Sequence, residues 1–147
     1  MAEREILFRG KLKDKDEWIG EWIEGIYCPC YWDLYMRRVE KPRIIILSNK
    51  KKTDGLWREV IPETVGQYTG LKDKNGVRIF EGDIVSIAKY GGLIYKVVYV
   101  PCRYELVNSK GVNCFVLDIY KSENIEVIGN IHDNPELLGG ENNGINR

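Results

Sequence analysis

The residues best suited to metal or nucleophilic chemistry are four cysteines and one histidine. They are Cys28, Cys30, Cys102, Cys114 and His132. Zinc sites usually pair cysteines that are separated by two to four residues, whereas a single residue separates Cys28 from Cys30. This spacing favours reduced thiols that pack as small apolar side chains, and we expect no metal and no cofactor. A nucleophilic Cys–His pair would need His132 beside one of the cysteines, which the sequence does not determine.

Two short acidic segments could be taken for functional loops. Asp73 opens the run Asp-Lys-Asn-Gly, which superficially matches the start of a calcium loop but lacks the further acidic ligands and the closing Glu. Asn75 and Gly76 instead favour a tight hairpin turn. Gly82 and Asp83 form a second turn, in which the glycine permits a sharp bend and the carboxylate bonds to main-chain amides. We interpret both segments as structural.

Short catalytic motifs are missing from the chain. The sequence contains no Gly-x-Ser-x-Gly, no His-Glu-x-x-His and no phosphate-binding glycine loop. Its acidic residues lie in turns and at scattered positions, a distribution typical of a solvated surface. We therefore predict no catalytic residue and a protein that is not an enzyme.

A basic stretch near the N-terminal third could bind nucleic acid. Aromatic residues stand close to it in sequence, among them Tyr31, Trp32, Tyr35 and Trp57, and a basic aromatic surface can bind a single strand. The alternative is a solvated loop beside core aromatics, which the net charge of zero favours. The basic residues in question are Arg37, Arg38, Lys41, Arg43, Lys50, Lys51 and Lys52.

Length and composition place the chain among ordinary globular proteins. It has 147 residues, of which 44% are hydrophobic and 30% charged, with 22 basic and 22 acidic side chains. No apolar run approaches the roughly 20 residues that a membrane span needs, and the charged start lacks the apolar core of a signal peptide. We expect a cytoplasmic protein that does not enter a membrane.

Clusters of aromatic and β-branched residues, separated by Gly, Asn, Asp and Pro, predict a mainly β fold. Tight turns between the clusters indicate antiparallel pairing. The expected strands cover residues 6–8, 21–27, 43–47, 57–61, 65–68, 77–80, 84–87, 93–100, 103–107, 114–120 and 125–131.

Turns and short helices complete the expected organisation. Asp33–Val39 and Pro135–Leu138 are each expected to form a helical turn, the second with Asn134 as its N-cap. Residues 1–138 are expected to form a single β domain, and the polar residues 139–147 a disordered tail. Structural roles in turns are assigned to Gly66, Gly70, Asn75, Gly76, Gly82, Asp83 and Gly129.

Several of these segments together resemble the YopX family of phage and prophage proteins. They are Arg4–Gly10, Trp22–Gly25, Thr64–Gly76 with Phe80–Val85, and Ile125–Leu138, which contains the run IGNIHDNPELL. The resemblance implies a mainly β pseudo-barrel, of the SH3-like or PRC type, built from short antiparallel strands with a small helical cap. It also implies a bacteriophage or prophage gene expressed in a bacterial host. The family is of uncharacterised function, so the resemblance supplies no catalytic or binding residues.

The sequence thus favours a non-enzymatic protein-interaction module acting in the bacterial host. Small β-barrels present loops and aromatic clefts to partners, and the aromatic residues proposed for protein binding are Trp32 and Trp57. The partner would be an unknown host or phage protein, or a second copy of the chain paired through exposed strand edges. The alternative is a nucleic-acid-binding accessory protein that uses residues 37–52.

Overall fold

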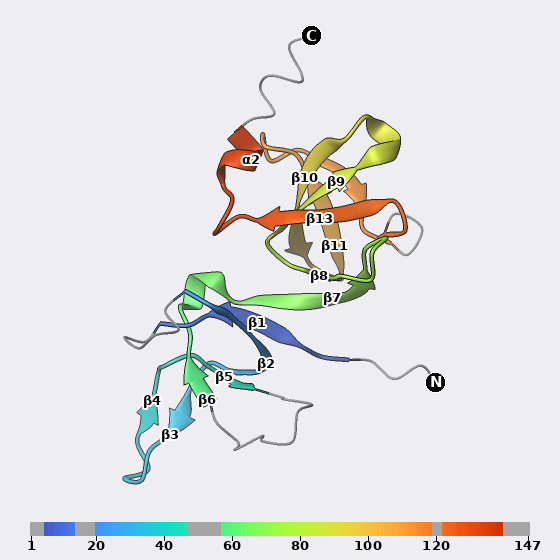
Figure 1. Ribbon diagram of the computed structural model, residues 1–147. Helices are drawn as coiled ribbons and strands as arrows, with labels where there is room; N and C mark the ends of the chain where they lie inside the picture. The colour runs from blue at the N-terminus through green and yellow to red at the C-terminus, as the bar shows by residue number, and fades with distance from the viewer. Residues whose placement is uncertain (1–4, 14–19, 47–56, 119–121, 140–147) are drawn as a thin grey trace. The chain divides into compact units, whose positions relative to one another are not determined.

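The computed structural model describes residues 5–13, 20–46, 57–118 and 122–139. These residues form thirteen strands, a four-residue helix and two short 3₁₀ turns, so the predicted mainly β class is confirmed. Every strand pairing is antiparallel. The chain divides into two compact units, Met1–Gln67 and Tyr68–Arg147 (Figure 1). No described helix has the length and apolarity that crossing a membrane requires.

A small sheet organises the first unit. Its strands run in the order β6-β5-β2-β1, and the first two residues of β7 pair with the other edge of β1. The core of this unit is thin: Ile44 and Val60 are fully buried, and both lie against Gly10, where a side chain would crowd them. The bounds are β1 Phe8–Lys11, β2 Trp22–Cys28, β5 Arg43–Ile46, β6 Trp57–Glu59 and β7 Gly66–Lys72, with a 3₁₀ turn at Pro62–Thr64.

A separate hairpin leaves this sheet between β2 and β5. It consists of β3 (Tyr31–Trp32) and β4 (Arg38–Val39), with Tyr31 opposite Val39 and Trp32 opposite Arg38. The predicted helical turn over Asp33–Val39 is therefore wrong. The loop is closed by one main-chain bond, from Asp33 N to Arg37 O (3.0 Å), and by the Asp33 carboxylate, which accepts the Arg37 N–H; together they hold the chain in a reversal.

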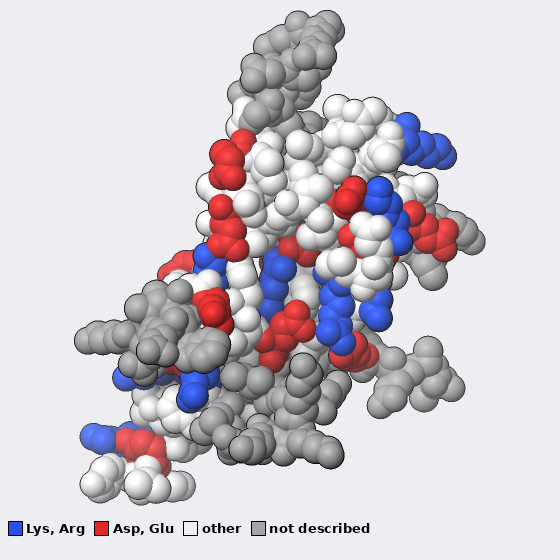
Figure 2. All heavy atoms as spheres, in the orientation of Figure 1, with Lys and Arg blue, Asp and Glu red and all other residues white. Residues whose placement is uncertain are grey.

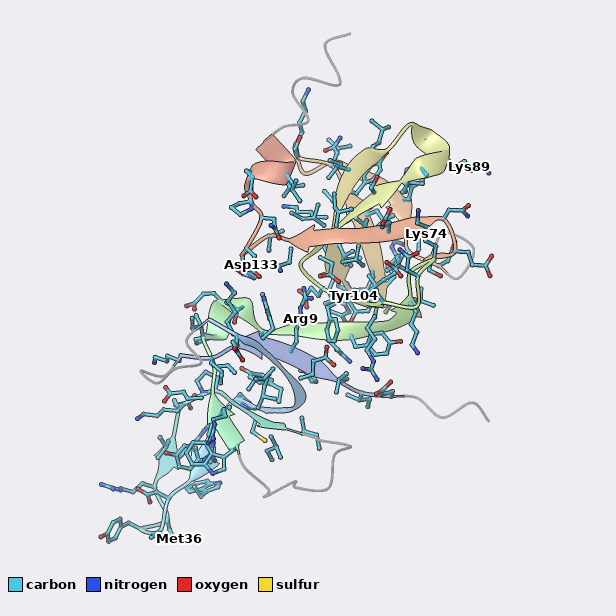
Figure 3. The ribbon with its side chains drawn as sticks, viewed as in Figure 1. Arg9, Met36, Lys74, Lys89, Tyr104 and Asp133 are labelled. Carbon is cyan, nitrogen blue, oxygen red and sulfur yellow. The ribbon has the colours of Figure 1, made fainter. Side chains whose placement is uncertain are left out.

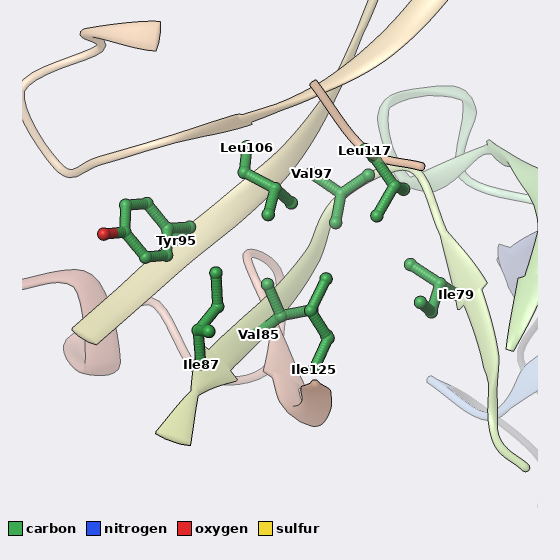
Figure 4. Close-up of a cluster of buried hydrophobic side chains, with 8 residues drawn as sticks. All are labelled: Ile79, Val85, Ile87, Tyr95, Val97, Leu106, Leu117 and Ile125. Carbon is green, nitrogen blue, oxygen red and sulfur yellow. The ribbon is translucent and has the colours of Figure 1, made fainter. Parts of the chain in front are cut away.

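The second unit has the larger core. Its five-stranded sheet has the order β12-β11-β10-β9-β13, and eight buried side chains from the sheet and its surroundings converge in one cluster (Figure 4). The cluster consists of Ile79, Val85, Ile87, Tyr95, Val97, Leu106, Leu117 and Ile125. The bounds are β8 Arg78–Phe80, β9 Asp83–Ile87, β10 Leu93–Val100, β11 Arg103–Val107, β12 Asn113–Val116, β13 Ile125–Asn130 and α2 Glu136–Gly139, with a 3₁₀ turn at Ala88–Tyr90.

The sheets are open, so closure into a barrel is not confirmed. In the described part of the second unit, β12 and β13 are the two edges of the sheet and do not pair with each other. The edge of β13 is instead occupied by the β7–β8 turn, because Lys74 N donates to Ile125 O (3.0 Å) and Val127 N donates to the Asp73 carboxylate (3.0 Å). An edge satisfied in this way has no need of a further strand.

Backbone conformation separates the predicted turn residues into two groups. Gly76 and Gly82 have φ of +80° and +87°, in the left-handed region that glycine adopts without strain. Gly66 and Gly129 lie within β7 and β13, so their assignment to turns is wrong. The reason at Gly129 is close packing: an added Cβ would lie 2.5 Å from Asn134 Oδ1.

The predicted helix at the C-terminal end is present but shifted by one residue. It was expected at Pro135–Leu138 and is found at Glu136–Gly139. The Asn134 side chain accepts a bond from the main-chain N–H of Asn130 (3.3 Å), which ties the helix to the end of β13. The expected tail lies almost wholly beyond residue 139, outside the described residues.

Candidate functional site

The tip of the β3–β4 hairpin carries the most exposed large apolar side chains among the described residues. Leu34 is 99% exposed, Tyr35 79%, Met36 77% and Trp32 65%. Single apolar residues are common on protein surfaces, but a contiguous group of this kind marks an interaction site. Figure 3 labels Met36 at the outer end of the hairpin. We call Trp32, Leu34, Tyr35 and Met36 the hairpin tip.

Asp33 holds the hairpin tip in one conformation. Its Oδ1 accepts the main-chain N–H groups of Tyr35 (2.8 Å) and Arg37 (2.9 Å), and its Oδ2 accepts the Arg37 guanidinium (2.8 Å). The N–H of Met36 donates to the Asp33 carbonyl (3.0 Å). The bonds to the carboxylate lower the pKa of Asp33 below its ordinary value of 3.8, and the bond from the Arg37 main-chain N–H has the largest effect. The apolar side chains are thus displayed on an ordered loop.

Met36 adopts a conformation that its residue type disfavours. Its φ is +59°, in the left-handed region where Gly and Asn are the usual occupants. A non-glycine residue held there costs on the order of 1 kcal/mol. The side chain of Met36 is mostly exposed and so recovers little of this cost by packing within the chain. A conformational cost at an exposed apolar residue points to a role outside the fold.

At the base of the hairpin, an arginine lies against two aromatic rings. The Arg43 guanidinium carbon is 3.5 Å from the centroid of the Tyr31 ring and 4.0 Å from that of Trp57, and the two ring centroids are 6.1 Å apart. Strand register explains the arrangement: Ile45 is opposite Trp57, and Arg43 lies two residues from Ile45 on the same face of the sheet. We call Tyr31, Arg43 and Trp57 the arginine clamp.

The basic residues predicted for nucleic-acid binding have differing environments. Arg37 pairs with Asp33 and Arg38 with Glu40 (3.0 Å), so nearby acids balance both charges. In Figure 2 the hairpin ends in uncharged residues, with basic and acidic residues directly beside them. Lys41 is exposed, Arg43 belongs to the clamp, and Lys50, Lys51 and Lys52 lie outside the described residues.

The structure also places the two tryptophans predicted for protein binding. Trp32 is in the hairpin tip and Trp57, 48% exposed, is in the arginine clamp. Sequence reasoning missed Leu34 and Met36, and it named Tyr35 only among the aromatic residues of the nucleic-acid alternative. A signal was present, because residues 31–36 read YWDLYM, an aromatic and apolar run with one acid and no strand-like alternation, followed directly by two arginines.

The remaining candidates make internal bonds. Asp73 Oδ1 accepts the N–H groups of Asn75 (2.8 Å) and Val77 (2.9 Å), and Asp83 Oδ2 accepts that of Phe80 (2.8 Å). These contacts support the structural interpretation of both acidic turns.

The thiols are spread over the chain. Cys28 and Cys30 are partly buried and Cys102 is exposed, all three free, while the side chain of Cys114 lies outside the described atoms. A search of the described residues finds no group of three or more His, Cys, Asp or Glu placed to hold a metal ion. His132 follows β13, where its N–H donates to Asn130 Oδ1 (3.0 Å).

Comparisons with known proteins give one family and a related structure. The family model described as YopX protein matches residues 29–139. The crystal structure of protein EF1440 from Enterococcus faecalis is similar, with 28% sequence identity, a TM-score of 0.51, and coverage of 92% of this chain and 99% of that one. No curated protein matches the chain. The family match includes the hairpin tip and most of the second unit, and on this basis the chain belongs to the YopX family.

Proposed function

We propose that this chain is a non-enzymatic protein-interaction module that inserts the hairpin tip into an apolar groove on a partner protein. The observation that supports it is the tip itself: four large apolar side chains, exposed together and held by the Asp33 bonds. A rigid loop loses little conformational entropy on binding, so more of its contact energy appears as affinity. The proposal includes a phage or prophage origin and a partner inside the bacterial host. It also includes a scaffold role for the second unit, in the manner of SH3-like or PRC-type domains.

Met36 supplies the second supporting argument. Selection for stability alone would favour Gly or Asn at φ +59°, yet a long apolar side chain stands there. Burying one such side chain in a partner contributes about 1.5–3 kcal/mol, which is roughly a 10- to 150-fold change in affinity. That gain outweighs the conformational cost, so the choice of Met is explained by binding.

The nucleic-acid alternative is weaker on the same residues. Binding to a phosphate backbone depends on several unneutralised basic side chains, whereas Arg37 and Arg38 are each paired with an acid. The exposed rings of Trp32 and Trp57 are the observation that supports this alternative, because nucleic-acid bases stack on exposed aromatic rings. Nuclease treatment separates the two functions.

The proposal is tested by comparing Met36→Asn with a matched control, Val77→Asn. Val77 is also an exposed apolar residue beside a hairpin turn, but in the second unit. Tagged wild-type protein and both variants are used to capture partners from bacterial lysate, with and without nuclease, and their urea unfolding midpoints are measured. We expect Met36→Asn to keep or raise the midpoint while losing at least about tenfold in capture, and Val77→Asn to capture normally.

Three results would contradict the proposal. One is capture that is unchanged by Met36→Asn. Another is capture that both variants reduce equally, which would mean that the tip has no special role. The third is capture that disappears after nuclease treatment, which would transfer support to nucleic-acid binding.

A further inference from the structure

Among the described residues, Arg43 of the arginine clamp makes no ion pair. Its guanidinium carbon is 3.5 Å from the centroid of the Tyr31 ring and 4.0 Å from that of Trp57. Its Nε is buried and has no hydrogen-bond acceptor. Burying a charged donor without an acceptor is unfavourable, and contact with two aromatic rings supplies no acceptor for the Nε–H. The Nε–H of Arg43 is therefore the unsatisfied donor of the clamp.

The acids of the hairpin and of strand β6 are bonded to other residues. Glu59 is the register partner of Arg43 on β6, but its Oε1 accepts from Lys13 Nζ at 3.1 Å. Asp33 and Glu40 bind Arg37 and Arg38. Among the described residues, then, no carboxylate is bonded to Arg43, although acids pair with the other two arginines of the hairpin region.

We infer that Arg43 binds a carboxylate, from an Asp or Glu side chain of the partner protein that receives the hairpin tip. This inference rests on the proposed function and adds the chemistry of the partner: an apolar groove bordered by an acidic residue. A guanidinium fork matches a carboxylate with two parallel hydrogen bonds. Contact with the two rings restricts the guanidinium before binding, which lowers the entropy lost when the carboxylate binds. The clamp would then give the docking surface its orientation, while the tip gives it apolar contact.

A carboxylate fits the surroundings of Arg43 better than a nucleic-acid phosphate. A phosphate backbone presents regularly spaced charges and is bound by several free cations, but the arginines nearest in sequence are balanced by their own acids. An arginine without an ion pair among the described residues, in the same unit as an apolar tip, corresponds instead to one acidic side chain at the border of an apolar groove.

The direct test is an NMR titration of the full-length, ¹⁵N-labelled protein, observing the Nε–Hε signals of the arginines. The probes are N-acetyl-glutamate N-methylamide, its neutral glutamine counterpart, and an eight-nucleotide thymidine strand, all at constant ionic strength. We expect the glutamate probe to shift the Arg43 signal saturably, with half-saturation on the order of tens of millimolar for a single charge-assisted pair, and the Arg38 signal to stay in place. The glutamine probe should leave Arg43 unchanged.

Equal effects of the glutamate and glutamine probes, or no effect of either, would overturn the inference. A thymidine strand that shifts Arg43 and Arg38 at lower concentration than the glutamate probe would also overturn it, and would identify a nucleic-acid surface. Because the titration uses the unmodified chain, it does not depend on any variant folding.

Two variants separate this inference from the proposed function. Arg43→Lys keeps the charge but loses the planar fork, so we expect partner capture to fall about tenfold with an unchanged urea midpoint. If capture is lost in Met36→Asn but kept in Arg43→Lys, the proposed function of the hairpin tip is supported and the carboxylate contact at Arg43 is contradicted. If capture is unchanged in both variants, the proposed function and the inference that rests on it are both contradicted.

Discussion

Asp73 provides the sharpest test of how the second unit is held together. The residue is 6% exposed, and its carboxylate accepts the main-chain N–H groups of Asn75, Val77 and Val127 at 2.8, 2.9 and 3.0 Å. Two of these bonds close the β7–β8 turn, and the third attaches the turn to the edge strand β13. In Asp73→Ala, the exposed turn amides regain bonds to water at a net loss of about 0.5–1.5 kcal/mol each. The partly buried Val127 N–H loses its acceptor, which costs about 1–3 kcal/mol.

Together these losses lower the free energy of unfolding by about 4 kcal/mol. With a urea slope of about 2 kcal/mol per molar, the unfolding midpoint falls by about 2 M. Glu123→Ala is the control, because it removes an exposed acid from the same unit. Hydrogen exchange at the Val127 amide should accelerate in Asp73→Ala and not in the control. The reasoning is refuted if the two variants have the same midpoint, or if the Val127 amide stays equally protected in both.

Three further predictions concern single positions. Gly25→Ala should abolish folding of the first unit or destabilise it by about 3 kcal/mol, because the new Cβ would overlap the main-chain carbonyl of Ile45 on the neighbouring strand; a normal circular dichroism spectrum and melting temperature would contradict this. Hydrogen bonds to its carboxylate, of which that from the Arg37 main-chain N–H has the largest effect, lower the pKa of Asp33, so the hairpin should be fully ordered above pH 3.8 and lose order as the pH falls through the lowered pKa. The amide chemical shifts of the hairpin measure this order. Asp33→Asn is the control, because its loss of order should be the same at neutral and at acid pH. Cys102→Gly should raise stability by up to about 1 kcal/mol, because the exposed Cys102 has a φ of +73°; thermal unfolding measures this, and a lower melting temperature would show that the thiol contributes packing.

Strand positions were predictable because their signals are local. Alternating β-branched and aromatic residues between glycine-rich turns predicted 93–100 and 103–107, and β10 and β11 have those bounds. The strand predicted at 21–27 is found one residue later, as Trp22–Cys28. In each case the residues that form the strand and those that end it are neighbours in sequence.

Features that depend on distant contacts could not be predicted in this way. Whether the sheet closes depends on which partner reaches the edge of β13, and that partner is a turn about fifty residues earlier in the chain. The β3–β4 hairpin was missed because its loop depends on a left-handed Met36, a residue type that gives no turn signal. For the candidate site, Trp32, Trp57 and Arg43 were named from sequence, but the cluster that unites Trp57 and Arg43 with Tyr31 requires the pairing of β5 with β6.

Site-specific photo-crosslinking at the hairpin tip tests the central claim most directly. A photoreactive phenylalanine derivative replaces Leu34 in one sample and Lys89, an exposed residue of the second unit, in another, and both are irradiated in bacterial cells. The account predicts a discrete protein adduct from position 34 that position 89 does not give, and its loss when Met36→Asn is added. A nucleic-acid adduct from position 34, or the same products from both positions, would contradict it.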